Sequence, residues 1–394
     1  MTSVRSPDAA ALHAAGLIPE RATRIAGAIQ RLVEQRRLPG LALRVARRGI
    51  VLDWSAGHHT TASSPATDAT TFMRFYSATK PMTSAVLFTF FEEGRWLFSD
   101  PITRFLPELL NLKVAGTGEP PQRPITMFDL LTHTAGFGYG IDEAHEVDRQ
   151  YAQVPVMDYS QPIQTLLARV ATLPLVQEPG FGFHYSVAHD LQGLIAERLG
   201  GKPLDVLMRE RLFEPAGMKT ATFGLTPQDL ANFAPVHRHD AEGHCQPVES
   251  APGLTYAWQV SPAPCLLSGG GGVLGTLEDE YRFLRLMAGC GSIDGIRVLA
   301  PATVKLMTGK ALDVMQPGAA STPGWFTLTT DPVPMGSCAS PGTLFTAGAG
   351  GNWGWIDGPR DLIVVGMMSV LNWFDASDSP SWIFDPLIYQ ALED

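Results

Sequence analysis

Residues 75–91 read Phe-Tyr-Ser-Ala-Thr-Lys-Pro-Met-Thr-Ser-Ala-Val-Leu-Phe-Thr-Phe-Phe, a long apolar segment whose one formal charge is on Lys80. Proline is tolerated in the first turn of a helix and breaks a helix interior, so Pro81 predicts a helix that begins near Ser77. Residues three apart share a helix face, which brings the Lys80 amine within reach of the Ser77 hydroxyl. Because an ammonium is costly among apolar side chains, this pair is a candidate for catalysis.

The pairing of a hydroxyl with a buried amine has a chemical rationale. A serine hydroxyl is a weak nucleophile until a neighbouring base accepts its proton. Burial can lower the pKa of a lysine from about 10.4 towards roughly 7–8, where it acts as a general base near neutral pH. The backbone N–H groups at a helix N-terminus also favour negative charge that develops there. The alternative interpretation is a plain helix whose Lys80 reaches out to solvent.

The remaining pattern predicts an α+β fold. Strand signals come from both ends of the chain, which predicts an antiparallel sheet flanked by helices, with a helical subdomain beside it. We expect a single catalytic domain over residues 1–394, with an α/β part at about 20–75 and 265–394 and a helical part at about 76–264. The expected elements are a helix at 20–38, a hairpin around Arg48-Gly49, a strand at 71–76, a helix N-capped by Thr276, two strands in GNWGWID and DLIVVGMMSV, and a helix at 380–391.

The amino-acid composition argues against some classes of binding partner. The net charge of −10 and the isoelectric point near 5.5 argue against nucleic acid or an anionic membrane as a partner. No stretch approaches 18 consecutive apolar residues, and the N-terminus lacks the apolar region of a secretory signal. The four cysteines form no Cys-x-x-Cys pair, which favours buried reduced thiols and a cytoplasmic location.

Four segments in chain order carry a family resemblance: FMRFYSATK (72–80), LLTHTAG (130–136), HYSV (184–187) and SGGGGV (268–273). Together with their flanks they resemble the class C β-lactamase and penicillin-binding-protein superfamily over most of residues 20–370. Within that superfamily the chain is most similar to the esterases with a β-lactamase fold, the family VIII carboxylesterases, and to the statin-type acyltransferases. The resemblance implies a β-lactamase/transpeptidase-like fold.

The resemblance also assigns roles to residues. It implies that Ser77 is the acylated nucleophile, that Lys80 accepts its proton, and that Tyr185 is a second base. It implies an oxyanion hole made by the backbone N–H groups of Ser77 and Ala349. We expect neither a cofactor nor a metal. A tyrosine can act as a base near neutral pH when a cation beside it lowers its pKa from about 10, and Lys80 supplies such a charge.

Two departures from the family pattern bear on the substrate. Val187 stands where β-lactamases have the Asn of Tyr-x-Asn, and Thr346-Ala347-Gly348 replaces Lys-Thr-Gly or the esterase forms Trp-Gly-Gly and His-Gly-Gly. Thr346 offers no positive charge to a β-lactam carboxylate, so both changes favour uncharged esters and leave the role of this third motif open. The candidate substrate-binding residues are Tyr139, Phe137, Val187, Thr346, Gly348, Trp353 and Trp355. For the aromatic residues among them, packing in the protein core is the alternative interpretation.

Other residues look like parts of a metal site or a catalytic site but do not form one. The stretch VHRHDAEGHCQP lacks a second cluster of strong ligands, so a solvated loop is a better interpretation than a metal site for His237, His239, His244 and Cys245. His133 in LLTHTAG belongs to a segment that is structural in the superfamily. Asp53-Trp-Ser-Ala-Gly57 lacks the first glycine of a nucleophile elbow, and Ser55 falls in a predicted hairpin strand.

The expected activity is hydrolysis of carboxylic esters with short acyl chains, through an acyl-Ser77 intermediate. Acyl transfer to an alcohol or amine, and β-lactamase or D-amino-acid peptidase activity, are alternatives that share the first half-reaction. An inactive ligand-binding homologue and a metal-dependent hydrolase are alternatives from other classes. The expected partner is a small-molecule ester, and the sequence predicts no oligomeric state.

Overall fold

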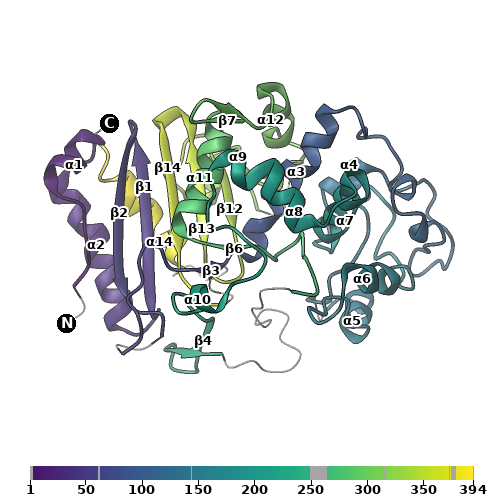
Figure 1. Ribbon diagram of the computed structural model, residues 1–394, viewed down its shortest axis with the longest axis horizontal. Helices are drawn as coiled ribbons and strands as arrows, with labels where there is room; N and C mark the ends of the chain where they lie inside the picture. Colours follow the sequence, from purple (N-terminus) through teal and green to yellow (C-terminus); the bar gives the residue numbers. More distant parts are fainter. Residues whose placement is uncertain are drawn as a thin grey trace.

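The computed structural model describes residues 3–60, 63–142, 144–248, 264–313, 316–371, 373 and 379–393. Residues 249–263 therefore lie outside the described residues. The described part contains an antiparallel sheet with helices on both faces and a helical region beside it (Figure 1). The predicted α+β fold is confirmed.

The main sheet has the strand order β2-β1-β14-β13-β12-β11-β10-β9 within the described residues, and every pair in it is antiparallel. The predicted hairpin is present as β1 and β2, joined at Arg48-Gly49. Strand β14 lies between β1 and β13, so the last strand of the chain joins the N-terminal hairpin to the rest of the sheet. The strands are β1 (Gly40–Arg47), β2 (Ile50–Gly57), β9 (Leu312–Asp313), β10 (Ala319–Ser321), β11 (Thr327–Thr329), β12 (Leu344–Ala347), β13 (Trp353–Asp357) and β14 (Leu362–Met367).

Each face of the sheet has its own apolar core. One core joins the sheet to α1 (Ala9–Ala14), α2 (Pro19–Glu34) and α14 (Pro380–Tyr389). The other core joins the opposite face to α11 (Leu277–Ala288) and continues into the helical region. Thr276 caps α11 in a capping box with Asp279, as the sequence predicted.

The helical region lies beside the sheet, at the right of Figure 1. Its central pair is α3 (Thr79–Glu92) and α7 (Ala188–Gly200), which pack against each other. The other helices of the region are α4 (Met127–Leu131), α5 (Glu146–Gln153), α6 (Ile163–Val170), α8 (Leu204–Met208), α9 (Glu214–Ala216) and α10 (Pro227–Leu230). Helices α12 (Pro301–Thr308) and α13 (Pro332–Met335) follow α11.

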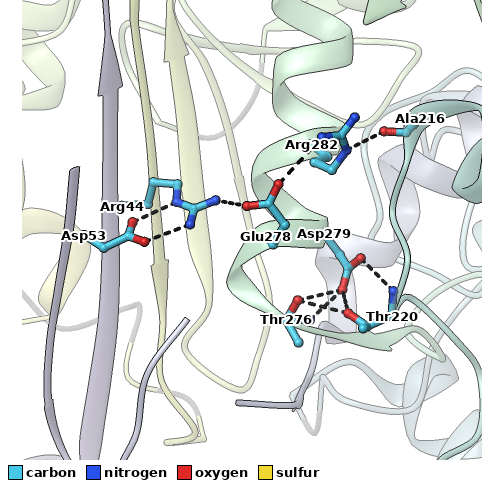
Figure 2. A network of polar contacts seen from close by, with 8 residues as sticks. All are labelled: Arg44, Asp53, Ala216, Thr220, Thr276, Glu278, Asp279 and Arg282. Atoms are coloured by element: carbon cyan, nitrogen blue, oxygen red, sulfur yellow. Dashed lines mark hydrogen bonds and ion pairs between the residues drawn. The ribbon is translucent and has the colours of Figure 1, made fainter. Parts of the chain in front are cut away.

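A network of charges fastens the sheet to the helical region through α11 (Figure 2). The buried Arg44 of β1 makes two hydrogen bonds of 2.8 Å to Asp53 of β2 and a third to Glu278 of α11. Glu278 also lies 3.7 Å from Arg282, which donates to the carbonyl of Ala216 at 2.7 Å. Arg44 is the buried member of this network, whereas the side chains of Asp53 and Glu278 are 39% and 47% exposed, and the paired charges connect the sheet to the helical region.

Three short two-stranded ladders lie outside the main sheet in the part of the chain that the structure describes. β3 (Met73–Arg74) pairs with β6 (Leu274–Gly275), and β7 (Ser292–Ile293) pairs with β8 (Ile296–Arg297). β4 (His237–His239) pairs with β5 (Cys245–Pro247), so the histidine-rich stretch is a hairpin. The prediction of a solvated loop is wrong for His237, whose side chain is buried and whose Nδ1 lies 3.2 Å from the carbonyl of Ser369.

The thiols are free but not buried. None of the four cysteines forms a disulfide, and Cys265, Cys290 and Cys338 are exposed while Cys245 is half-buried. The expectation of buried thiols is therefore wrong. Among the described residues, no three His, Cys, Asp or Glu side chains gather as a metal site would require. In the same residues, no helix combines the length and apolar character needed to cross a bilayer.

Candidate active site

The chain changes direction just before Ser77. After β3 it forms a tight turn at Tyr76–Ala78, and α3 follows from Thr79, with Pro81 in its first turn as predicted. Tyr76 has a φ of 46°, a left-handed conformation that is rare for a bulky side chain. Such strain is usual where a fold has to aim a reactive side chain. Ser77 thus lies at the N-terminal end of a buried helix.

The structure brings Ser77, Lys80 and Tyr185 together. The Ser77 Oγ lies 2.7 Å from the Tyr185 Oη and accepts a hydrogen bond of 3.1 Å from the Lys80 Nζ. Lys80 is fully buried, so the alternative in which it reaches solvent does not hold. An ammonium can only donate, so a charged Lys80 donates to the Ser77 Oγ, whereas either hydroxyl can be the donor between Ser77 and Tyr185. The geometry therefore provides a short path for the nucleophile's proton.

Three aromatic rings surround the Lys80 ammonium. Its Nζ lies 4.8 Å from the ring centre of Tyr185, 5.7 Å from that of Tyr139 and 6.0 Å from that of Trp325. The negative faces of aromatic rings attract a cation and partly replace the water that burial removes. Trp325 also contacts Tyr185, with 5.4 Å between the ring centres. Trp325 is a site residue that sequence reasoning missed, because no motif surrounds it.

The glycine-rich segment reaches Lys80 through its backbone. Lys80 Nζ donates to the carbonyl of Gly270 at 2.6 Å. The buried Asp190 holds this segment by accepting from the Ser268 hydroxyl at 2.5 Å and from the Gly270 N–H at 3.2 Å. Burial raises the pKa of Asp190, although the hydrogen bonds and Lys80 oppose that effect. SGGGGV therefore orients the amine, a function that its resemblance alone did not specify.

The structure places Tyr139, a candidate substrate-binding residue, beside Tyr185. Its ring stacks on Tyr185, with 5.2 Å between ring centres. The buried Asp148 holds the backbone here by accepting from four consecutive N–H groups, those of residues 139–142. Burial alone would raise the pKa of Asp148, but the hydrogen bonds from His184 and these N–H groups bring it well below its usual value.

The third motif lies against the nucleophile turn. A Cβ at Gly348 would collide with the carbonyl oxygen of Phe75, and a Cβ at Gly350 would meet the ring of Tyr76. Only glycine permits this close approach of two backbones. Ala349, between these glycines, packs against the small apolar cluster that contains Tyr76. This adjacency is what an oxyanion hole shared by Ser77 and Ala349 requires, and that assignment stays a prediction. Thr346 is buried, and its hydroxyl has no hydrogen-bond partner among the described residues.

Several candidate pocket residues are buried in the two apolar cores. Phe137 and Val187 are fully buried in the core of the helical region. Trp353 and Trp355 stack on each other in the core on the far face of the sheet, where Trp353 contacts Phe384 of α14. Core packing, the alternative interpretation for the aromatic candidates, therefore describes Phe137, Trp353 and Trp355, and Val187 is buried in the same core as Phe137.

Comparisons with known proteins agree with this architecture. The chain belongs to the β-lactamase family, whose model matches residues 25–384. It is 34% identical to Protein Rv1367c of Mycobacterium tuberculosis over 75% of this chain and 76% of that protein. It is 29% identical to Esterase EstB of Burkholderia gladioli over 91% and 92% of the two chains. The solved structure of EstCE1, a hydrolase with promiscuous acyltransferase activity, matches with a TM-score of 0.81 at 23% identity, over 95% of this chain and 99% of that one.

Proposed function

We propose that the protein is a serine hydrolase that cleaves carboxylic esters through an acyl-Ser77 intermediate. The observation that carries the proposal is the hydrogen bonding of the Ser77 Oγ to the Tyr185 Oη at 2.7 Å and to the Lys80 Nζ at 3.1 Å. Membership of the β-lactamase family and the names of relatives such as Esterase EstB support it.

The proposed acylation step uses these three side chains and begins with Tyr185 as the phenolate. The Ser77 Oγ attacks the ester carbonyl carbon while its proton passes to the Tyr185 phenolate, and the Lys80 ammonium stabilises the negative charge that the Tyr185 oxygen loses with this transfer and regains when it passes the proton on. The carbonyl oxygen becomes an oxyanion that the N–H groups of Ser77 and Ala349 stabilise, each worth about 3 kcal/mol. When the C–O bond breaks, the leaving alcohol takes the proton from Tyr185. An acyl-Ser77 ester remains.

The second step returns the enzyme to its starting state. Water donates a proton to Tyr185 and attacks the acyl carbon, and Ser77 leaves with that proton as the acid is released. An alcohol in place of water gives acyl transfer, which is our second candidate function because the structural neighbour EstCE1 is described as having it. The uncharged Thr346 favours neutral esters over β-lactams, and the preference for short acyl chains is part of the same proposal.

An ester panel with a labelling experiment tests this function. We expect turnover of p-nitrophenyl butyrate to exceed that of a chromogenic cephalosporin, and a fluorophosphonate to add to Ser77 as seen by mass spectrometry. Ser77→Ala should lower ester turnover by roughly 10⁴-fold or more. Ser55→Ala is the matched control, since Ser55 is a buried serine of strand β2. Unchanged turnover in Ser77→Ala, or no adduct on Ser77, would reject the proposal.

A further inference from the structure

A chain of buried polar side chains runs behind the site. His133 Nε2 lies 2.9 Å from His189 Nδ1, and His189 Nε2 lies 3.3 Å from the Ser84 hydroxyl. Ser84 donates to Gln192 Oε1 at 3.2 Å, and Gln192 donates to the carbonyl of Leu130 at 3.2 Å. His133, His189, Ser84 and Gln192 are all fully buried. Four buried polar side chains in one line have to satisfy one another, because water cannot reach them.

The direction of every hydrogen bond in this chain follows from its first link. The backbone N–H of Ser186 donates to His133 Nδ1 at 2.9 Å, so that nitrogen carries no proton. A neutral His133 then carries its proton on Nε2 and donates to His189 Nδ1. His189 must in turn carry its proton on Nε2 and donate to Ser84. All hydrogen bonds in the chain therefore point the same way, from the backbone N–H of Ser186 at one end to the backbone carbonyl of Leu130 at the other.

The surroundings keep both rings neutral. Burial lowers the pKa of His133 well below its usual value, and the charges of Lys80 and His184 lower it further. Burial also lowers the pKa of His189, with contributions from His133 and Lys80. A proton added to either ring would remove an acceptor that the chain requires. The lowered pKa values favour the neutral form of both rings, and the hydrogen bonds decide which nitrogen of each ring carries the proton.

The chain contacts Tyr185 at one end and lies on the helix of Lys80 at the other. The His133 ring stacks on Tyr185 at 5.3 Å between ring centres with 8° between the planes. His133 also binds the backbone on both sides of Tyr185, because its carbonyl accepts from the N–H of His184 at 2.8 Å and its ring accepts from that of Ser186. At the other end, Ser84 lies one helical turn after Lys80 on α3.

We propose that His133 and His189 are positioning residues, a neutral and directed pair that fixes Tyr185 against Ser77 and Lys80. The pair connects the segment that carries the phenol to the helix that carries the nucleophile. It touches neither the substrate nor a reacting atom, so its effect passes through Tyr185. The catalytic consequence rests on the proposed function, whereas the proton order of the pair does not.

Nitrogen NMR of the histidine rings tests the proton order. In protein labelled with ¹⁵N-histidine, we expect His133 and His189 to show Nε2–H tautomers that do not titrate between pH 5 and 9. The single variants His133→Gln and His189→Gln assign the signals. A proton on Nδ1 of either ring, or a ring that becomes charged above pH 6, would overturn the proposal whatever the activity of the enzyme.

Substitution at His189 tests the positioning role. Glutamine can accept from His133 and donate to Ser84, whereas leucine of similar size can do neither. We expect His189→Leu to lower kcat for p-nitrophenyl butyrate by roughly 10- to 100-fold with KM changed less than twofold, and His189→Gln to recover most of the loss. The matched control is His237→Gln, a buried histidine of β4 outside the chain, which should leave kcat unchanged.

A second readout separates this proposal from the proposed function. The ¹³Cζ resonance of Tyr185 reports the surroundings of the phenol without any turnover. We expect it to shift in His189→Leu and to stay within the range of the unmodified protein in His189→Gln. If the enzyme is active and His189→Leu changes neither kcat nor the Tyr185 resonance, the positioning role is overturned. If His189→Leu does not fold, the tautomers and the His189→Gln variant decide the question.

Discussion

The prediction that follows most directly from the structure concerns Glu280, a buried carboxyl group for which the described residues provide no charged partner. It lies on α11, and its Oε2 accepts a hydrogen bond of 3.2 Å from the side chain of Asn352. Among the described residues its Oε1 has no hydrogen-bond partner. The backbone carbonyl of Asn352 accepts a hydrogen bond of 2.9 Å from the N–H of Gly348. Glu280 therefore lies beneath the turn that carries Ala349. The perturbation is Glu280→Gln, which keeps the shape and removes the charge.

The magnitude follows from the pKa of Glu280. Burial raises this pKa from 4.5 to about 7, although the hydrogen bond from Asn352 opposes the change. Between these values the unfolded chain releases the proton while the native protein keeps it, so rising pH favours unfolding. At about 1.4 kcal/mol for each pH unit, the free energy of unfolding should fall by about 3 kcal/mol between pH 4.5 and 7 on account of this group.

Guanidinium unfolding followed by tryptophan fluorescence measures this effect. The difference in unfolding free energy between Glu280→Gln and the unmodified protein should grow in favour of the variant as pH rises from 4.5 to 7, and level off above that. Other carboxyl groups contribute equally to both proteins and cancel. Glu214→Gln is the control, because Glu214 is 64% exposed and its removal should leave the pH profile unchanged. A constant difference between the two proteins across this range would refute the reasoning.

Two further predictions concern the rings around Lys80. Tyr185→Phe removes the phenol that receives the nucleophile's proton and keeps the stacking, so kcat for p-nitrophenyl butyrate should fall by roughly 10²- to 10⁴-fold with the unfolding midpoint nearly unchanged; a fall of less than fivefold would contradict the proposed role. Trp325→Ala removes the contacts of its ring with those of His133, Phe183, Tyr185 and His189, each worth about 1 kcal/mol, so the free energy of unfolding should fall by about 4 kcal/mol in a denaturant titration. Trp325→Phe should recover part of that loss, and an equal loss in both variants would show that ring packing is not the cause.

The sequence predicted those features that depend on neighbouring residues. The Arg48-Gly49 hairpin, the cap at Thr276 and the approach of Lys80 to Ser77 each need only a turn signal or a helical spacing, and the structure contains all three. The approach of Tyr185 came from the family resemblance. Spacing could not predict it, because the residue is brought in by the packing of α7 on α3.

The errors have a physical cause as well. Trp353 and Trp355 were candidates for the pocket because they follow the third motif in sequence. Alternate residues of a strand face opposite sides of a sheet, so the two tryptophans share one face and Gly354 has the other, where it contacts Leu284 of α11. Applying this period of two to Trp-Gly-Trp would have placed both rings away from α11. Trp325 gave no such signal, since only tertiary contacts bring it to Lys80.

The position of β14 between β1 and β13 has a consequence for synthesis of the chain. On the ribosome, the hairpin at 40–57 emerges early, yet one edge of β1 has no hydrogen-bonding partner until residues 362–367 follow. An unpaired strand edge is a template for pairing with other chains. The nascent protein therefore carries an aggregation-prone edge through most of its translation, and a chain that stops before residue 362 never covers it.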